Sequence, residues 1–69
     1  MSPLVVVVNG ERREVPPGTT VGMLVSESGV SENAVAVEVN ERLVPRADRA
    51  QHRLREGDRI ELVTLVGGG

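Results

Sequence analysis

Three glycines, Gly67, Gly68 and Gly69, end the sequence after an apolar, strand-like run at residues 62–66. Glycine lacks a Cβ, so such a segment is thin, adopts many backbone angles and can enter a narrow channel. Three extended residues reach roughly 10 Å. The chemistry that this segment could offer is that of its carboxyl group. A carboxylate is a poor acyl donor because its charge discourages nucleophilic attack, so Gly69 would need activation by another protein.

The glycine segment has a second interpretation, in which it is a frayed end without a role. Termini are weakly ordered in most domains, and glycine-rich ends are also left behind by engineered fusions. The glycines alone leave both interpretations open, so the rest of the sequence has to decide between them.

Composition narrows the classes of function. The 69 residues make one small domain with too little volume for a deep pocket, so we do not expect this chain to be an enzyme. Ten acidic residues stand against eight arginines, and the net charge of −2 offers no basic footprint for nucleic acid. Phe, Tyr and Trp are absent, which removes the platforms that stack on single-stranded bases.

Metal, cofactor and redox sites lack their usual ligands. The chain has no cysteine, which excludes disulfides, thiolate metal sites and thiol nucleophiles. His52 is the only histidine, so a zinc site would need carboxylates as its other protein ligands. We therefore expect no metal and no cofactor bound by this chain. Because the N-terminus lacks a basic leader and its apolar run is too short to span a bilayer, we expect a cytoplasmic protein.

The first elements of the chain are predicted as a hairpin and a helix. A β-branched run at residues 4–8 meets the strong turn signal Asn9-Gly10 and a second strand at 11–15, which the Pro-Pro-Gly at 16–18 ends. Thr19 or Thr20 can cap a helix that Gly29 ends. Its apolar residues recur at helical spacing, at Val21, Leu24 and Val25. This short helix needs a sheet beneath it to be stable.

The second half of the chain is predicted to be mostly strand. Valines alternate with other residues at Val35, Val37 and Val39, which indicates a half-buried strand. The remaining elements are a turn at 40–41, a short strand closed by Pro45, a loop or single helical turn at 46–54, a turn at 56–58 and a final strand at 59–66. The order predicts an α+β roll of the β-grasp kind, a mixed sheet of four to five strands with one main helix across it. Residues 1–66 form the domain and residues 67–69 a flexible tail.

The loop before the last strand is rich in arginine, at Arg46, Arg49, Arg53 and Arg55. We interpret these side chains as solvated charges, and the alternative is a contact with an acidic partner surface. We expect His52, which lies among them, to be exposed and without a role.

Four fragments in order resemble one family: "PPGTTVGMLV", "VEVNERLVPR", "LREGDRIELV" and the terminal Gly68-Gly69. They resemble the ubiquitin-like sulfur carriers of the ThiS/MoaD superfamily, and most closely the ThiS type of thiamine biosynthesis. The resemblance covers essentially the whole chain. Many members carry a tryptophan near Arg49, and this chain has none.

The resemblance implies a protein cosubstrate. An E1-like adenylyltransferase of the ThiF/MoeB type, which uses ATP and Mg²⁺, would convert Gly69 into an acyl-adenylate, with Gly67 and Gly68 as its flexible lead. Sulfur from a cysteine desulfurase or another source would then give a thiocarboxylate for a thiazole synthase of the ThiG type. Since the chain has no cysteine, its terminal carboxyl is the place where it could carry sulfur.

Two alternatives to the thiamine role stay open. The sulfur could serve another product, such as molybdopterin, cysteine or thiolated tRNA, although the short length favours the thiamine type. The chain could instead be a non-catalytic β-grasp interaction domain that never uses its end.

An apolar docking face is predicted next to the tail. In the last strand, Ile60, Leu62, Thr64 and Val66 project to one face and Arg59, Glu61, Val63 and Leu65 to the other. Aligning Asn9 with its counterpart in the family places Leu4, Val6 and Val8 inward and Val5 and Val7 outward, beside Val63 and Leu65. Such a patch marks a protein interface, whereas the alternative is that β-branched residues simply favour strands. The predicted partner-binding residues are Val5, Val7, Val63, Leu65 and Val66.

Overall fold

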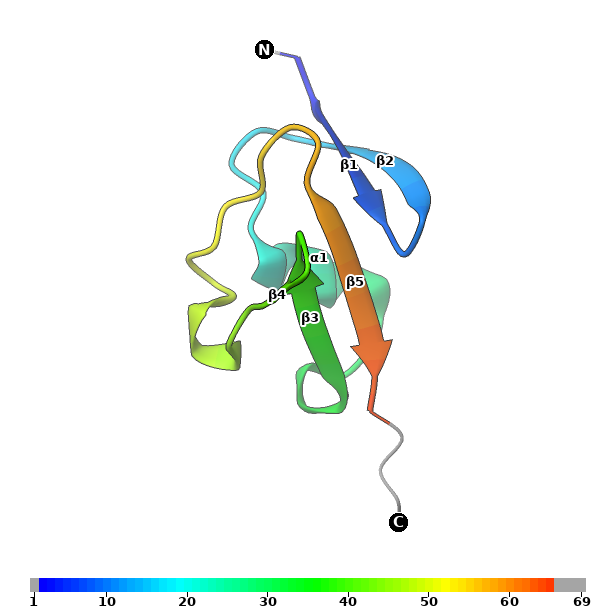
Figure 1. The fold of residues 1–69 in the computed structure, drawn as a ribbon. Helices are drawn as coiled ribbons and strands as arrows, with labels where there is room; N and C mark the ends of the chain where they lie inside the picture. Colours follow the sequence, from blue (N-terminus) through cyan, green and yellow to red (C-terminus); the bar gives the residue numbers. More distant parts are fainter. Residues whose placement is uncertain (1, 66–69) are drawn as a thin grey trace.

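The computed structural model describes residues 2–65 as one five-stranded sheet with an α-helix across one face (Figure 1). In chain order the elements are β1 (Leu4–Val8), β2 (Glu11–Val15), α1 (Val21–Ser28), the 3-10 helix η1 (Glu32–Ala34), β3 (Val35–Val39), β4 (Arg42–Leu43), the 3-10 helix η2 (Arg46–Asp48) and β5 (Arg59–Thr64). The sheet order is β2-β1-β5-β3-β4, with β1 and β5 parallel and the other neighbours antiparallel. The predicted mixed β-grasp sheet is confirmed.

Two tight turns set the register of the hairpins. Asn9 and Gly10 have φ angles of 49° and 82°, and they connect β1 to β2 as a two-residue loop. Asn40 and Glu41, at φ 52° and 69°, connect β3 to β4 in the same way. Positive φ at both central residues matches the twist of the flanking strands, which explains the preference for asparagine and glycine at such positions.

The helix begins and ends at residues that the sequence indicated. Of the two candidate caps, Thr20 is the N-cap: its hydroxyl accepts from the Met23 N–H at 3.2 Å, while the Met23 sulfur accepts from the Thr20 N–H at 3.4 Å. Thr19 instead donates its hydroxyl to the Pro16 carbonyl at 2.6 Å. Gly29 ends the helix in the left-handed conformation at φ 78°. The capping residue and the terminal glycine, both local in sequence, were therefore sufficient to predict where this helix begins and ends.

The core lies between α1 and the sheet and is entirely aliphatic. Three helix residues are fully buried, at Val21, Leu24 and Val25. From the sheet and the loops they meet Val6, Val8, Val15, Val35, Val37, Val39, Val44, Leu54 and Ile60. Leu4, Val30 and Leu62 pack at the edge of this cluster. The face of the sheet opposite to α1 is called the open face below.

Arg49 is buried, whereas the sequence predicted a solvated charge like those of the other arginines in its loop. The residue is only 7% exposed. Its guanidinium donates from Nη1 to the Glu32 carbonyl at 3.1 Å and from Nη2 to the Val35 carbonyl at 2.6 Å. Nε has no partner among the residues that the structure describes. The rigid fork of donors reaches two carbonyls at once, so Arg49 ties the end of η2 to the start of β3.

Helix α1 approaches the same loop at Gly22. The Gly22 N–H donates to the Arg49 carbonyl at 2.9 Å. A Cβ at Gly22 would lie 3.4 Å from both the Arg49 carbonyl oxygen and the Ala50 Cα. Glycine weakens a helix, and here it permits this close approach of helix and loop backbones.

Candidate functional site

The chain reaches its C-terminus through β5, which lies between β1 and β3 in the sheet (Figure 1). Five residue pairs join it to β3, from Val35 opposite Thr64 to Val39 opposite Ile60. Just after the strand, the Leu65 N–H still donates to the Ala34 carbonyl at 2.7 Å. β5 ends at Thr64, whereas the sequence predicted a strand to residue 66. The predicted site residues Val66, Gly67, Gly68 and Gly69 lie outside the described residues.

Asn9 holds the other side of β5 with its side chain. Its backbone N–H donates to the Ile60 carbonyl at 2.9 Å. Beyond this point its Oδ1 accepts from the Leu62 N–H at 2.8 Å, and its Nδ2 donates to the Leu62 carbonyl at 3.4 Å. The side-chain amide thus makes the hydrogen bonds to β5 that the backbone of a further residue would make if β1 were longer. Sequence reasoning found Asn9 only as a turn residue; the available signal was that asparagine tolerates the left-handed region and carries both a donor and an acceptor.

The predicted assignment of strand faces is confirmed for the described residues of β1 and β5, and Val66 lies outside them. Val6, Val8 and Ile60 are at most 7% exposed and face the helix. Leu4 and Leu62 are partly buried and pack against the same cluster. On the open face, Val5 and Val7 are half-buried, while Val63 and Leu65 are 46% and 52% exposed.

The predicted adjacency of these residues is wrong. β1 pairs with β5 only through Val7 opposite Arg59 and Val8 opposite Ile60. Val63 lies four residues beyond Arg59, which at about 3.3 Å per residue places it roughly 13 Å further along the sheet than Val7. The reason is that β1 turns back at Asn9, halfway along β5, so Val5 and Val7 never reach the end of that strand.

Val63 has other neighbours on the open face. Its partner across the sheet is Ala36 of β3, and cross-strand partners present their side chains on the same face. We call Ala36, Val63 and Leu65 the β5-end patch. In the next row, Leu43 of β4 pairs with Glu38, which pairs with Glu61. The apolar surface nearest to the tail is therefore small and bordered by acidic side chains.

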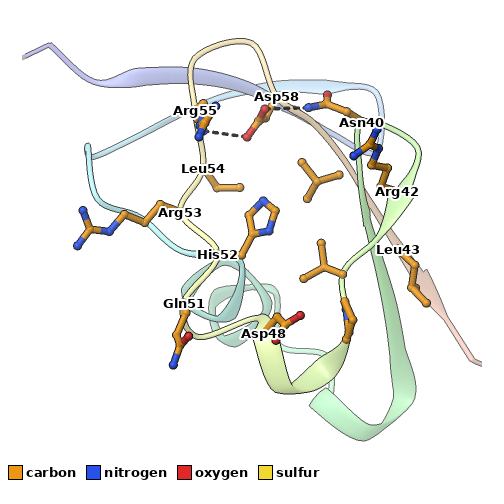
Figure 2. Close-up of a pocket in the computed structure, with 13 residues that line it drawn as sticks. Asn40, Arg42, Leu43, Asp48, Gln51, His52, Arg53, Leu54, Arg55 and Asp58 are labelled. Carbon is orange, nitrogen blue, oxygen red and sulfur yellow. Dashed lines mark hydrogen bonds between the residues drawn. The ribbon is translucent and has the colours of Figure 1, made fainter.

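A second feature is a hollow of about 1140 Å³ beside β4, between the β3–β4 turn, η2 and the loop at 51–58 (Figure 2). The Asp58 carboxylate forms its upper wall, accepting from Asn40 Nδ2 at 3.0 Å and from the Arg55 N–H at 2.8 Å. Figure 2 shows the His52 ring directed into this hollow and the Arg53 guanidinium directed away from it. His52 is half-buried, which corrects the expectation that it is exposed.

Two further properties hold for residues 2–65. No group of three or more His, Asp or Glu side chains within this range is placed to hold a metal ion. Within the same range, no helix is both long and apolar enough to cross a membrane.

Comparison with known sequences identifies relatives of two kinds. The ThiS family model matches residues 6–69. The sulfur carrier protein ThiS of Escherichia coli is 30% identical over 64 residues, which cover 93% of this chain and 97% of that protein. The thiazole synthase of Paramagnetospirillum magneticum is 43% identical over 63 residues, which cover 91% of this chain. The chain spans only 19% of that thiazole synthase, and likewise 19% of the one from Magnetococcus marinus.

Known structures give the same fold. The crystal structure of the thiamine biosynthesis protein ThiS from Geobacter metallireducens matches with a TM-score of 0.80 at 28% identity, covering 96% of this chain and 100% of that one. The family model spans every fragment on which the resemblance was based, and the structural match covers 96% of the chain. The chain therefore belongs to the ThiS family of ubiquitin-like sulfur carrier proteins.

Proposed function

We propose that the carboxyl group of Gly69 carries sulfur as a thiocarboxylate. A carboxylate oxygen attacks the α-phosphorus of ATP and pyrophosphate leaves, so that the glycine becomes an acyl-adenylate. Sulfide then attacks the acyl carbon, forming a C–S bond as the C–O bond to AMP breaks. Where the sulfur arrives as a persulfide, the same attack gives an acyl disulfide, and a second thiol attacks its S–S bond, so that the thiocarboxylate leaves and the two thiols end as a disulfide. ATP and Mg²⁺ belong to the E1-like adenylating partner, and the sulfur comes from a cysteine desulfurase or an equivalent source. The chain acts as a cosubstrate in this scheme.

The observation that carries this proposal is the family match over residues 6–69, which includes the terminal glycines. The absence of cysteine adds support, because it leaves the terminal carboxyl as the group able to hold sulfur. The fold adds a mechanical argument. The tail continues from an inner strand that neighbours hold on both sides, so a partner can draw the glycines into a cleft while the domain stays folded.

We propose a thiazole synthase as the acceptor, and thus a role in making the thiazole ring of thiamine. Two proteins named as thiazole synthases each contain a segment similar to this chain, over 19% of their length. A segment carried in the same polypeptide meets its catalytic partner at a high effective concentration. We infer that a carrier of the same family is suited to dock on such a synthase.

We propose the β5-end patch as the surface that positions the tail in its partners. Val63 and Leu65 are about half exposed, and they directly precede the residues that would enter the partner's cleft. Exposed apolar side chains gathered near a functional group are typical of protein interfaces. Val5 and Val7 form a second contact on the same open face, separated from the patch by Arg59 and Glu61. Val66 is proposed to enter the partner together with the glycines.

The test is the intact mass of the purified chain after incubation with ATP, a sulfur source and the E1-like enzyme of the same organism. We expect a gain that corresponds to one oxygen replaced by sulfur, and its loss when Gly69 is deleted. The starting mass also measures whether Gly69 is the free terminus. Retained modification in the deletion variant would refute the role of Gly69. An unchanged mass, with the enzyme active on another carrier, would refute the carrier role with this enzyme.

A further inference from the structure

Two turn asparagines bond to the backbone of β5, one at its start and one towards its end. Asn40, in the β3–β4 turn, accepts with Oδ1 from the Arg59 N–H at 3.0 Å and donates from Nδ2 to the Asp58 carboxylate at 3.0 Å. Asn9, in the β1–β2 turn, bonds to both backbone groups of Leu62. Each asparagine is the first residue of a two-residue turn and has a positive φ. They are a matched pair, and only Asn9 acts on the part of β5 that leads to the tail.

The Asn9 amide makes the last hydrogen bonds on the β1 side of β5 within residues 2–65. β1 pairs with β5 only as far as Val8, because the chain turns back there, halfway along β5 (Figure 1). Beyond Leu62 the strand is held on its other side alone, by two residue pairs with β3 and by the hydrogen bond from the Leu65 N–H to the Ala34 carbonyl. A strand end held along one edge can swing about that edge. The Asn9 amide therefore decides how far towards the tail β5 is anchored on both sides.

Asn9 is preorganised for this contact although it is exposed to solvent. Its backbone N–H donates to the Ile60 carbonyl at 2.9 Å, which fixes the residue against β5. With the backbone fixed, only the rotation of a short side chain has to be ordered for the amide to reach Leu62. An amide carries both a donor and an acceptor, so one side chain bonds to the N–H and to the carbonyl of Leu62.

The opposite side of the strand end rests on the junction of η1 and β3. The Ala34 carbonyl accepts from Leu65, and Val35 pairs with the last residue of β5. The Val35 carbonyl is in turn held by the buried Arg49 guanidinium at 2.6 Å. The β3 side is thus fixed through the interior of the domain, whereas the β1 side depends on one exposed amide. At Asn9 the anchoring of the strand end can therefore be altered without disturbing the core.

We propose that Asn9 is a positioning residue for the reaction of the C-terminus. By anchoring β5 at Leu62 it fixes the place and the direction in which the chain leaves the sheet towards Gly69. This inference rests on the proposed function, in which the Gly69 carboxylate meets the α-phosphorus of ATP in the adenylating partner. Asn9 touches neither reactant and acts only through the strand.

Chain length shows why the anchor matters for the rate. Seven residues follow Leu62 and four follow Leu65. Fully extended, these stretches span at most roughly 25 Å and roughly 14 Å. A chain that is loose from Leu62 onward searches a larger volume, so its carboxylate meets the nucleotide at a lower effective concentration. Reaction geometry is demanding as well, because a displacement of about 1 Å can cost up to about 100-fold in rate.

The experiment compares Asn9→Gly with its matched control Asn40→Gly. Glycine removes the amide at either position and adopts positive φ without strain, so both turns should form. Each variant loses two side-chain hydrogen bonds, so a merely structural effect should be of similar size in both. Asn9→Asp is the conservative variant. It keeps the Oδ1 acceptor for the Leu62 N–H and tolerates the left-handed region, but it cannot donate to the carbonyl.

The first measurement needs no partner and follows hydrogen–deuterium exchange by NMR in the full chain. The Leu65 N–H reports on the strand end, and the Leu24 N–H, which donates to the Thr20 carbonyl in the buried helix, reports on global unfolding. In Asn9→Gly, exchange at Leu65 relative to Leu24 should become about fivefold faster, because one anchoring contact is lost. In Asn40→Gly this ratio should stay within about twofold of wild type.

The second measurement is ATP–pyrophosphate exchange by the adenylating enzyme at varied concentrations of the carrier. Positioning acts on kcat, whereas the surfaces that bind the enzyme and set KM are unchanged. We expect Asn9→Gly to lower kcat about threefold to tenfold with KM within about twofold of wild type. Asn9→Asp should fall between wild type and Asn9→Gly, and Asn40→Gly should keep the wild-type kcat.

The outcomes separate this inference from the proposed function. An unchanged exchange ratio at Leu65 in Asn9→Gly would overturn the anchor, whatever the chemistry of the carrier. Faster exchange with an unchanged kcat would overturn the positioning role and leave the proposed adenylation intact. An equal loss of kcat in Asn40→Gly would reduce the effect to stability and overturn the positioning role. If the wild-type carrier supports no pyrophosphate exchange, the proposed function fails and the positioning role with it, while the NMR ratio still decides whether Asn9 anchors the strand.

Discussion

Replacing Arg49 by alanine should destabilise the domain far more than replacing its neighbour Arg46. The substitution removes two hydrogen bonds from a charged donor, at 3.1 and 2.6 Å, to the carbonyls of Glu32 and Val35. Hydrogen bonds to charged groups are worth about 1.5–3 kcal/mol each. Part of this loss is offset, because the substitution also removes the desolvation cost of a guanidinium that is only 7% exposed. We expect a net loss of about 2–4 kcal/mol in the free energy of unfolding.

This loss is large for so small a domain. Its total free energy of unfolding should be roughly 3–10 kcal/mol, and each kcal/mol lost lowers Tm by about 4–8 °C at this size. The assay is urea denaturation followed by far-ultraviolet circular dichroism, because the chain has no tryptophan or tyrosine to report by fluorescence. Arg49→Lys should fall between wild type and alanine, since a lysine ammonium retains the charge but lacks the fork that reaches two carbonyls.

Arg46→Ala is the control, since Arg46 is exposed, and a surface substitution should change stability by less than about 0.5 kcal/mol. Equal midpoints for Arg49→Ala and Arg46→Ala would refute the reasoning, because they would mean that the buried guanidinium contributes no more than a solvated one. A stabilised Arg49→Ala would mean that the cost of removing the cation from water exceeds the value of its two hydrogen bonds.

Three further predictions concern the strand that leads to the tail and the helix above it. Asn9→Ala should lower the free energy of unfolding in urea by about 1–3 kcal/mol, because alanine is strained at a φ of 49° and the Leu62 N–H loses its side-chain acceptor. Asn9→Gly should lower it by less, because glycine adopts this φ without strain. Leu65→Asp should raise the KM for adenylation with an unchanged urea midpoint, and an unchanged KM would exclude the β5-end patch from docking. At a helical position without close neighbours, replacing glycine by alanine stabilises a protein by about 1 kcal/mol. Gly22→Ala should stabilise this domain by less, because the added Cβ would lie 3.4 Å from the Ala50 Cα. A gain of the full amount in the same assay would show that this contact costs no stability.

The features that the sequence predicted correctly depend on nearby residues. The Asn9-Gly10 turn and the spacing of Val21, Leu24 and Val25 are local, and so is the alternation in β3. The stagger of β1 against β5 could not be predicted in this way, because it is set by two residue pairs whose members are about fifty positions apart in the sequence. The burial of Arg49 likewise depends on two carbonyls, 14 and 17 residues away, at the junction of η1 and β3. The residues next to Arg49 in the sequence give no indication that two distant carbonyl groups will accept hydrogen bonds from its side chain.

The position of β5 sets how far the tail can reach. Leu65 is still bonded to Ala34, and Thr64 lies opposite Val35, so the residues that a partner can draw into its cleft begin after these contacts. Releasing one residue from β5 would lengthen the reach by about 3.3 Å at the cost of one or two backbone hydrogen bonds of about 1 kcal/mol each. Docking on the β5-end patch competes with that release, because Val63 and Leu65 must stay on the sheet to present their side chains. Under the proposed function, a partner that holds the patch therefore fixes the depth at which Gly69 meets its nucleotide, and the terminal glycines adjust only the direction of approach.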